Sequence, residues 1–293
     1  MVVSIQDLDC FDLIVWLRTG EAAGQRIGYS QSKVCRTIAA VSKTFDISIE
    51  KRCNEWYVLG DLTILNLERR VHQQYRWNEG CSLRLEAQYY SGPLFCDPIP
   101  NGWITGNFDY LEIHTPLRHL RDGVIDAWIG CFPDVPEPDD PDFACFHLTR
   151  LPTHLVVAEN HPLVTKGDAI SMEDIRAYPS LALPDGAFPK VQRVLEEQGL
   201  WNLTVDRLRY SKTEWEGRVE TDLVIGYASA FSIGLFEKPQ IILPISIPLI
   251  VGDSIVVRKE FAGHPQFLSL LTQLRQKAQD LAQKYPDVSI PEP

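Results

Sequence analysis

The chain has 293 residues, of which 45% are hydrophobic, and carries a formal net charge of -11 at pH 7. This length and apolar content suffice for two or three globular units, each with its own core. No stretch approaches the ~18 consecutive apolar residues of a membrane span, and the first residues lack the basic start and apolar core of a signal peptide. The sequence therefore argues against a membrane or secreted protein and predicts a cytoplasmic one.

Two short helices are predicted before residue 28. The first ends near Gly20 and the second covers about residues 21–27. Their apolar positions, which we expect to be buried, are Leu8, Phe11, Val15, Ala22, Ala23 and Ile27. Only Gly28 and Tyr29 separate the second helix from the next, which is the spacing of a helix-turn-helix.

Residues 29–45 predict one helix with two opposed faces. Its apolar stripe, at positions that recur with a helical period, is Val34, Ile38, Val41 and Phe45. Ser30 occupies the N-cap position, and polar or basic residues fall outside the stripe on the first two turns. Donors and cations at this end of a helix suit the DNA major groove. An ordinary surface helix with a solvated polar face fits the same residues.

A short hairpin is predicted after the third helix. Two apolar segments, near residues 47–49 and 56–59, flank a polar stretch that contains Lys51 and Arg52. Such a wing can contact DNA phosphates. The candidate DNA-binding residues are therefore Ser30, Gln31, Ser32, Lys33, Arg36, Thr37, Lys51 and Arg52.

Residues 61–80 predict a linker helix that Asp61 can cap and Gly80 can end. It carries Leu62, Leu65, Leu67 and Val71 among basic and amide side chains. Pairing with a second copy of the chain would bury this apolar face. Packing of the helix on its own chain is the alternative.

The negative charge is unevenly distributed. Residues 1–60 contain seven acidic and seven basic residues and residues 61–80 three of each, so all eleven surplus negative charges lie in residues 81–293. Basic side chains near the N-terminus can therefore still meet phosphate locally. The seven cysteines occur singly, without a Cys-x-x-Cys pair, so we expect free thiols and no metal site.

From residue 82 onward, strands and helices alternate in the order of a parallel sheet covered by helices. Strands are expected at residues 83–87, 109–114, 127–130, 180–183, 203–208, 223–225, 241–243 and 253–257, with helices near 190–198 and 265–284. The predicted class is α/β, with a winged helix-turn-helix (1–60), a linker helix (61–80) and two hinged Rossmann-like lobes (81–293). Lobe I covers about 82–157 and 258–284, and lobe II about 158–257.

A cleft between two hinged α/β lobes is a common place for a small ligand. Ligands in such sheets lie beyond the carboxyl ends of strands, where helix N-termini offer free N–H groups. The candidate effector-binding residues at these places are Gln88, Tyr89, Tyr90, Ser91, His114, Thr115, Phe188, Ser211 and Lys212. The aromatic residues favour a flat or apolar ligand, although each of them could equally pack in a core.

Several segments together resemble the LysR-type transcriptional regulators, over nearly the whole chain. They are Ser30-Gln31-Ser32 with Arg36, the stretch 121–129 (RDGVIDAWI), and the stretch 155–163 (LVVAENHPL). The resemblance implies a regulator that binds a double-stranded DNA operator, assembles into a dimer or tetramer through the linker helix, and holds a small effector, often a carboxylate or aromatic acid. It implies no catalytic residue, cofactor or membrane contact. The seven histidines are scattered and form no recognisable catalytic motif.

The chain departs from the family pattern at Gly20, Gly24, Cys35 and Asp61. Gly24 stands where a small helix former is usual, which predicts a loss of ~1 kcal/mol of helix stability. A ligand-sensing dimer whose DNA-binding unit has decayed is therefore the alternative function. The exposed polar face at Gln31, Ser32, Lys33 and Arg36 favours the regulator.

Overall fold

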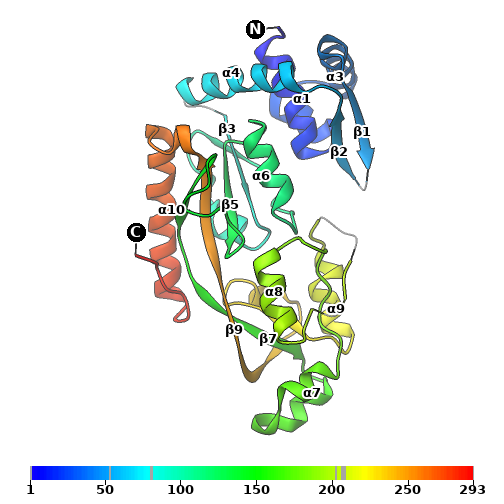
Figure 1. Ribbon diagram of the computed structural model, residues 1–293, viewed down its shortest axis with the longest axis vertical. Helices are drawn as coiled ribbons and strands as arrows, with labels where there is room; N and C mark the ends of the chain where they lie inside the picture. Colours follow the sequence, from blue (N-terminus) through cyan, green and yellow to red (C-terminus); the bar gives the residue numbers. More distant parts are fainter. Residues whose placement is uncertain (1, 53, 80–81, 202, 206–208, 293) are drawn as a thin grey trace.

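The protein is described here by a computed structural model covering residues 2–52, 54–79, 82–201, 203–205 and 209–292 (Figure 1). Its N-terminal unit is a winged helix-turn-helix made of α1 (Ile5–Leu17), α2 (Gly20–Ile27), α3 (Gln31–Phe45) and an antiparallel hairpin of β1 (Ser48–Arg52) and β2 (Glu55–Leu59). The side chain of Ser30 caps α3 as predicted, because its Oγ accepts from Lys33 N at 3.4 Å. The predicted helices and wing are confirmed.

The linker helix α4 (Thr63–Glu79) follows directly. Its start is fixed by Asp61, whose Oδ1 accepts from Thr63 N at 2.9 Å. The polar face of the helix packs on its own chain, where Arg69, Gln73 and Arg76 are buried. Leu67 and Val71 of the predicted apolar face are more than half exposed, as pairing with a second copy would require.

The two lobes share one mixed seven-stranded sheet. Lobe I contains β3 (Leu83–Ala87), α5 (Ser91–Phe95), β4 (Trp103–Thr105), α6 (His114–Arg121), β5 (Ala127–Phe132), β6 (Phe143–His147) and the C-terminal α10 (Pro265–Lys284). Lobe II contains the 3-10 helix η1 (Pro162–Ala169), α7 (Met172–Arg176), α8 (Pro189–Glu197), α9 (Glu216–Thr221) and β8 (Gly226–Ala228), with shorter 3-10 turns at Lys212–Glu214 and Ile233–Leu235. The 3-10 turn Lys259–Phe261 leads into α10.

Two long strands connect the lobes. β7 (Leu151–Ala158) and the 19-residue β9 (Gln240–Arg258) run antiparallel to each other. The C-terminal part of β9 pairs with β5 and β6 of lobe I, and its N-terminal part pairs with β7 toward lobe II. Figure 1 shows this pair as the long bridge between the upper and lower parts of the molecule. The predicted two-lobed α/β fold is confirmed.

Some predicted strands are not formed. At residues 109–114 only Tyr110 makes bridge contacts, and His114 already begins α6. The carboxylate of Glu112 accepts from Thr115 N at 2.9 Å, a local contact that favours a helix start over an extended strand. In lobe II, Ser180 and Ile225 form only a single bridge, and part of the predicted strand 203–208 lies outside the described residues.

The winged helix-turn-helix is docked on lobe I. Leu8 and Phe11 of α1 belong to the same apolar cluster as Leu120 and Val124 of lobe I. Trp16 Nε1 donates to Glu86 Oε2 on β3 at 2.7 Å. The N-terminal unit and lobe I therefore share a continuous core.

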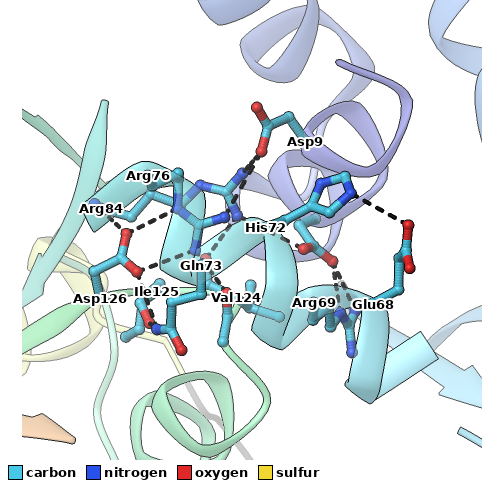
Figure 2. Close-up of polar contacts among 12 residues, drawn as sticks. Asp9, Glu68, Arg69, His72, Gln73, Arg76, Arg84, Val124, Ile125 and Asp126 are labelled. Atoms are coloured by element: carbon cyan, nitrogen blue, oxygen red, sulfur yellow. Dashed lines mark hydrogen bonds and ion pairs between the residues drawn. The ribbon is translucent and has the colours of Figure 1, made fainter. Parts of the chain in front are cut away.

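Ion pairs join α1 of the N-terminal unit, the linker helix α4 and lobe I, as Figure 2 shows. Arg69 of α4 donates to Asp12 of α1 at 2.8 Å, and Arg84 of β3 donates to Asp9 of α1 at 2.7 Å. Arg76 of α4 contacts Asp126, just before β5, at 3.0 Å. Removing one partner of such a buried pair leaves an uncompensated charge, which typically costs about 3–5 kcal/mol. The network therefore fixes the orientation of α1 and α4 on lobe I.

Candidate nucleic-acid interface and ligand pocket

The N-terminal turns of α3 present polar and basic side chains to solvent. Gln31, Ser32, Lys33 and Arg36 are all exposed. The ammonium of Lys33 lies 3.3 Å from the centroid of the Tyr29 ring, and Arg36 Nε donates to Ser32 O at 3.3 Å. These contacts hold both cations near the end of the helix that carries its unpaired N–H groups.

Thr37 does not share this exposed face. Its exposed fraction is 7%, and it lies with Val34, Val41 and Phe45 on the buried side of α3. Ile38, which was predicted to be buried, is only half-buried. The buried stripe follows positions i, i+3, i+7 and i+11, so it differs from the predicted one only in that Thr37 takes the place of Ile38. The assignment of Thr37 to the DNA-facing set is therefore wrong.

The wing supplies two further exposed cations. Lys51 Nζ lies 3.4 Å from Arg18 O at the end of α1, and its ammonium lies over the Trp56 ring. Arg52 pairs with Glu50 at 2.6 Å, with both side chains exposed. Each cation is tied to a neighbour by a weak surface contact that phosphate could replace.

The wing is also attached to the effector lobes. Arg209, in a loop of lobe II, donates to Glu55 Oε2 of β2 at 2.7 Å and to Asp109 Oδ1 at 2.6 Å. Arg18, at the end of α1, pairs with the same Asp109. The guanidinium of Arg209 stacks 3.3 Å from the centroid of the Tyr110 ring. This cluster links the wing to both lobes.

A pocket lies between the lobes, which we call the interlobe pocket, with a cavity volume of about 110 Å³. Lobe I and the connecting strands supply Gln88, Tyr89, Tyr90, Leu111, Cys131, Thr153, Leu249 and Val251. Lobe II supplies Leu183, Phe188, Val191, Leu195, Trp215, Tyr227, Ala228, Ser229 and Ser232. The lining is thus mostly apolar and aromatic with a few neutral polar groups, which is typical of a small-molecule site.

Four of the nine predicted effector residues line this pocket: Gln88, Tyr89, Tyr90 and Phe188. The structure places the other five elsewhere. The hydroxyl of Ser91 donates to Asp253, and His114 Nε2 lies 2.8 Å from Gly186 O. Thr115 is buried at the start of α6, Ser211 lines a separate small cavity beside Arg209, and Lys212 pairs with Glu237 at 3.3 Å.

Sequence reasoning missed several lining residues. Cys131 stands near the carboxyl end of β5, so the strand-end rule could have found it. Leu151, Thr153 and Leu155 occupy every second position of β7, which puts all three on the same face of the sheet. Tyr227 lies two residues beyond the predicted strand 223–225, so the same rule could have found it, whereas Trp215 comes from a segment that carries no comparable local signal.

Burial keeps the ionisable groups of the pocket neutral. Desolvation raises the pKa of both Tyr89 and Tyr90 well above 10, and it raises the pKa of the Cys131 thiol to about 12. Tyr89 stacks on Tyr210 with ring centroids 3.9 Å apart and meets Tyr90 edge-on at 5.3 Å. The aromatic wall is therefore stacked and uncharged at neutral pH.

The outer face of α4 carries an apolar stripe, which we call the α4 stripe. Its members are Ile64, Leu67, Val71 and Tyr75, whose exposed fractions range from 45% to 60%. They recur at i, i+3, i+7 and i+11, the period of a helix–helix seam. The opposite, polar face of α4 packs on lobe I and α1. The helix therefore has one face buried on its own chain and one apolar face without a partner in that chain.

The cysteines at positions 10, 35, 96, 131 and 145 are free thiols, whereas Cys53 and Cys81 lie outside the described residues. Across the described ranges no cluster of histidine, cysteine and acidic side chains is arranged to hold a metal ion. In the same ranges no helix is both long enough and apolar enough to cross a membrane.

Comparisons with known proteins agree with this architecture. Residues 110–279 match the LysR substrate binding domain. A full-length single-residue variant of OxyR from Pseudomonas aeruginosa is 17% identical, with 99% of each chain covered and a TM-score of 0.61. Full-length CbnR in complex with its target DNA is 16% identical over 94% of this chain and 100% of that one, with a TM-score of 0.54. Full-length BenM is 15% identical over 99% and 100%, with a TM-score of 0.51. No curated protein matches the sequence.

Proposed function

The chain belongs to the family of LysR-type transcriptional regulators, whose substrate binding domain matches more than half of its length, and on that premise we propose how this member works. It binds a double-stranded DNA operator through α3 and the wing of each of two subunits. A small molecule in the interlobe pocket controls that binding.

The observation that carries this proposal is the exposed end of α3. Gln31 and Ser32 offer hydrogen-bonding groups for base edges, and Lys33 and Arg36 offer cations for bases or phosphates. The docking of the winged helix-turn-helix on lobe I leaves this face in solvent. The net charge of residues 1–80 is zero, so these cations do not compete with a local acidic surplus.

Two further features support the dimerisation and the ligand control that this proposal requires. The α4 stripe offers a seam along which a second copy can pair, giving a dimer or a tetramer with two-fold symmetry. The Arg209 cluster connects the wing to the loop that precedes Tyr210, and Tyr210 stacks on a wall of the interlobe pocket. A ligand that displaces Tyr89 would therefore act on the wing through neighbouring residues.

We also propose that the protein acts by binding alone, without catalysis and without a cofactor. This follows the character of its family, whose members regulate transcription. Its place of action would be the cytoplasm, where operator DNA is accessible, with no membrane partner.

The test compares operator binding by wild type and by a Lys33→Ala, Arg36→Ala double variant. Genomic fragments retained by the purified protein at moderate salt are sequenced, and a recovered dyad site is then titrated. We expect the double variant to lose most affinity and to show a shallower dependence on salt, by about 0.9 in the log–log slope for each phosphate contact removed. Lys43→Ala is the control, because Lys43 is also exposed but lies at the distal end of α3.

Each result has a definite meaning. Equal losses in the Lys43→Ala control and the double variant would indicate non-specific electrostatic binding rather than readout by the end of α3. Wild-type protein that retains no specific fragment would contradict the proposal and favour a ligand-sensing dimer with a decayed DNA-binding unit. Circular dichroism of each variant tests whether the fold is intact.

A further inference from the structure

The lining of the interlobe pocket has a charge pattern that restricts its ligand. Among the described residues that line it, none is lysine, arginine, histidine, aspartate or glutamate. Five aromatic side chains enclose the space: Tyr89, Tyr90, Phe188, Trp215 and Tyr227. An anionic ligand would thus lose its hydration without gaining a cationic partner, which is strongly unfavourable.

Two buried carboxyl groups lie behind the aromatic wall, and the half-buried cation Arg150 interacts with one of them, Asp253, and with Cys131 of the lining. Asp253 is fully buried and accepts from Ser91 and Thr149, next to Tyr90. Glu216 is 1% exposed and accepts from Tyr210 Oη at 2.8 Å, next to Tyr89. Two carboxyl groups behind the aromatic wall oppose a carboxylate inside it.

Four buried polar atoms of the lining have no hydrogen-bond partner among the described residues: Gln88 Nε2, Tyr90 Oη, Thr153 Oγ1 and Tyr227 Oη. Gln88 and Thr153 are the two that are not aromatic. Gln88 is 1% exposed, and its Nε2 has no hydrogen-bond acceptor among the described residues. Thr153 is 7% exposed, and its Oγ1 has no hydrogen-bond partner in the same part of the chain. An unsatisfied buried polar group is costly, so such groups in a pocket indicate positions that a ligand satisfies. Gln88 requires an acceptor, and Thr153 accepts or donates.

We infer that the interlobe pocket takes a small uncharged molecule, about the size of one substituted ring, that presents a carbonyl or hydroxyl oxygen to Gln88 and a second polar atom to Thr153. This inference deepens the proposed function, since it relies on that function only for naming the ligand an effector. It also replaces the carboxylate that the family resemblance suggested with a neutral group.

The volume of the interlobe pocket limits the size of the ligand. An engineered apolar cavity of about 150 Å³ is known to hold benzene, and the interlobe pocket measures about 110 Å³. The pocket therefore accepts one small ring, with modest side-chain adjustment, rather than a fused or extended system. Rings that stack on Tyr89 or meet Tyr90 edge-on gain additional aromatic contact.

The test uses a series in which only the charge changes. Benzamide, benzoate and benzylammonium each carry one ring and one polar substituent of similar size. Their binding to the full chain at pH 7.5 is measured by calorimetry and by thermal unfolding. We expect benzamide to bind about tenfold or more tightly than benzoate, because benzoate, unlike benzamide, must lose a full ionic hydration shell.

Two variants locate the binding. Gln88→Leu removes the Nε2 donor while keeping the volume similar, and it should weaken benzamide about five- to tenfold. Val191→Phe fills the cavity from α8 and should abolish binding of every ring compound. If Val191→Phe does not fold, Gln88→Leu alone still decides whether the ligand lies at this site.

Three results would overturn the inference. They are benzoate binding as tightly as benzamide, tighter binding of benzylammonium, which would indicate an aromatic cage for cations, and failure of benzamide to bind at millimolar concentration. Operator binding by the unliganded protein is measured in parallel. Loss of DNA binding would count against the proposed function, whereas the order of the three ligands judges the inference alone.

Discussion

Gly24 lies inside α2, where glycine normally costs about 1 kcal/mol relative to alanine. In the folded protein a Cβ on this residue would lie 2.4 Å from the carbonyl oxygen of Tyr29. The backbone N–H of Tyr29 donates to Gly24 O at 2.9 Å. The absence of a side chain thus lets the turn between α2 and α3 close tightly on α2. The sequence predicted only the helix penalty, because the compensating contact depends on the position of the turn.

We expect Gly24→Ala to destabilise the protein by about 1–3 kcal/mol, since the added methyl group must displace backbone. The free energy of unfolding is measured by urea titration. Gly217→Ala is the matched control: residue 217 is also helical, in α9, and its added Cβ would meet nothing closer than 3.7 Å. That control should be neutral or stabilising by up to about 1 kcal/mol. A Gly24→Ala variant as stable as wild type would show that the turn relaxes freely.

At the scale of single elements, the sequence predicted the bounds of a helix correctly where its capping residues and its apolar periodicity agree. The helix at 265–284 was predicted with the bounds of α10, and the helix at 190–198 lies within one residue of α8. The linker helix was predicted correctly in extent, and its exposed Leu67 and Val71 fit the predicted pairing with a second copy, but the burial of its polar face was not predicted. Its burial is decided by Asp12 and Asp126, which lie far from it in sequence and attract Arg69 and Arg76 inward. Periodicity alone cannot contain that information.

The α4 stripe should hold two chains together. Leu67→Glu places a charge in the middle of the stripe, where Leu67 is 58% exposed in the single chain. We expect the dimer dissociation constant to rise at least about 100-fold, because two charges must be desolvated in a symmetric seam. Light scattering over a dilution series measures the change.

Leu268→Glu is the control for this substitution, because Leu268 on α10 is 46% exposed and lies outside α4. Its mass in solution should equal that of wild type. A dimer that survives Leu67→Glu but dissociates in Leu268→Glu would move the seam from α4 to α10.

At the scale of the whole molecule, the fold class and the order of its parts were predicted from the sequence, but the docking of one part on another was not. The strand-end rule placed Gln88, Tyr89, Tyr90 and Phe188 at the pocket, since a strand determines the position of the residues that follow it. It failed for Lys212, which points to Glu237 instead. Glu86, at the junction of α1 and lobe I, carried no sequence signal at all.

Glu86 makes the docked structure sensitive to pH. Burial raises the pKa of its carboxyl from 4.5 to about 7, despite hydrogen bonds from Ala87 N and the Trp16 indole that favour the charged form. Between these two pH values the folded chain keeps a proton that the unfolded chain has lost. Raising the pH therefore favours unfolding, and the stability present below pH 4.5 is lost as the pH passes through 7.

We expect the ionisation of Glu86 to lower the free energy of unfolding by about 3 kcal/mol between about pH 4.5 and about pH 8. Urea titrations at several pH values measure the slope for wild type and for Glu86→Gln, which cannot ionise. The difference between the two slopes isolates Glu86 from other titrating groups, whatever the absolute stability of the variant. Parallel slopes would mean that the carboxyl stays ionised in the folded protein.

The shared core of α1 and lobe I bears on how such regulators could be recombined. Exchanging the first 60 residues for those of another regulator would take away Trp16, Asp9 and Asp12 together. Glu86, Arg84 and Arg69 would then face foreign side chains in a dry interior. A working chimera has to carry both sides of that interface across, so the transferable module ends inside lobe I rather than at the linker.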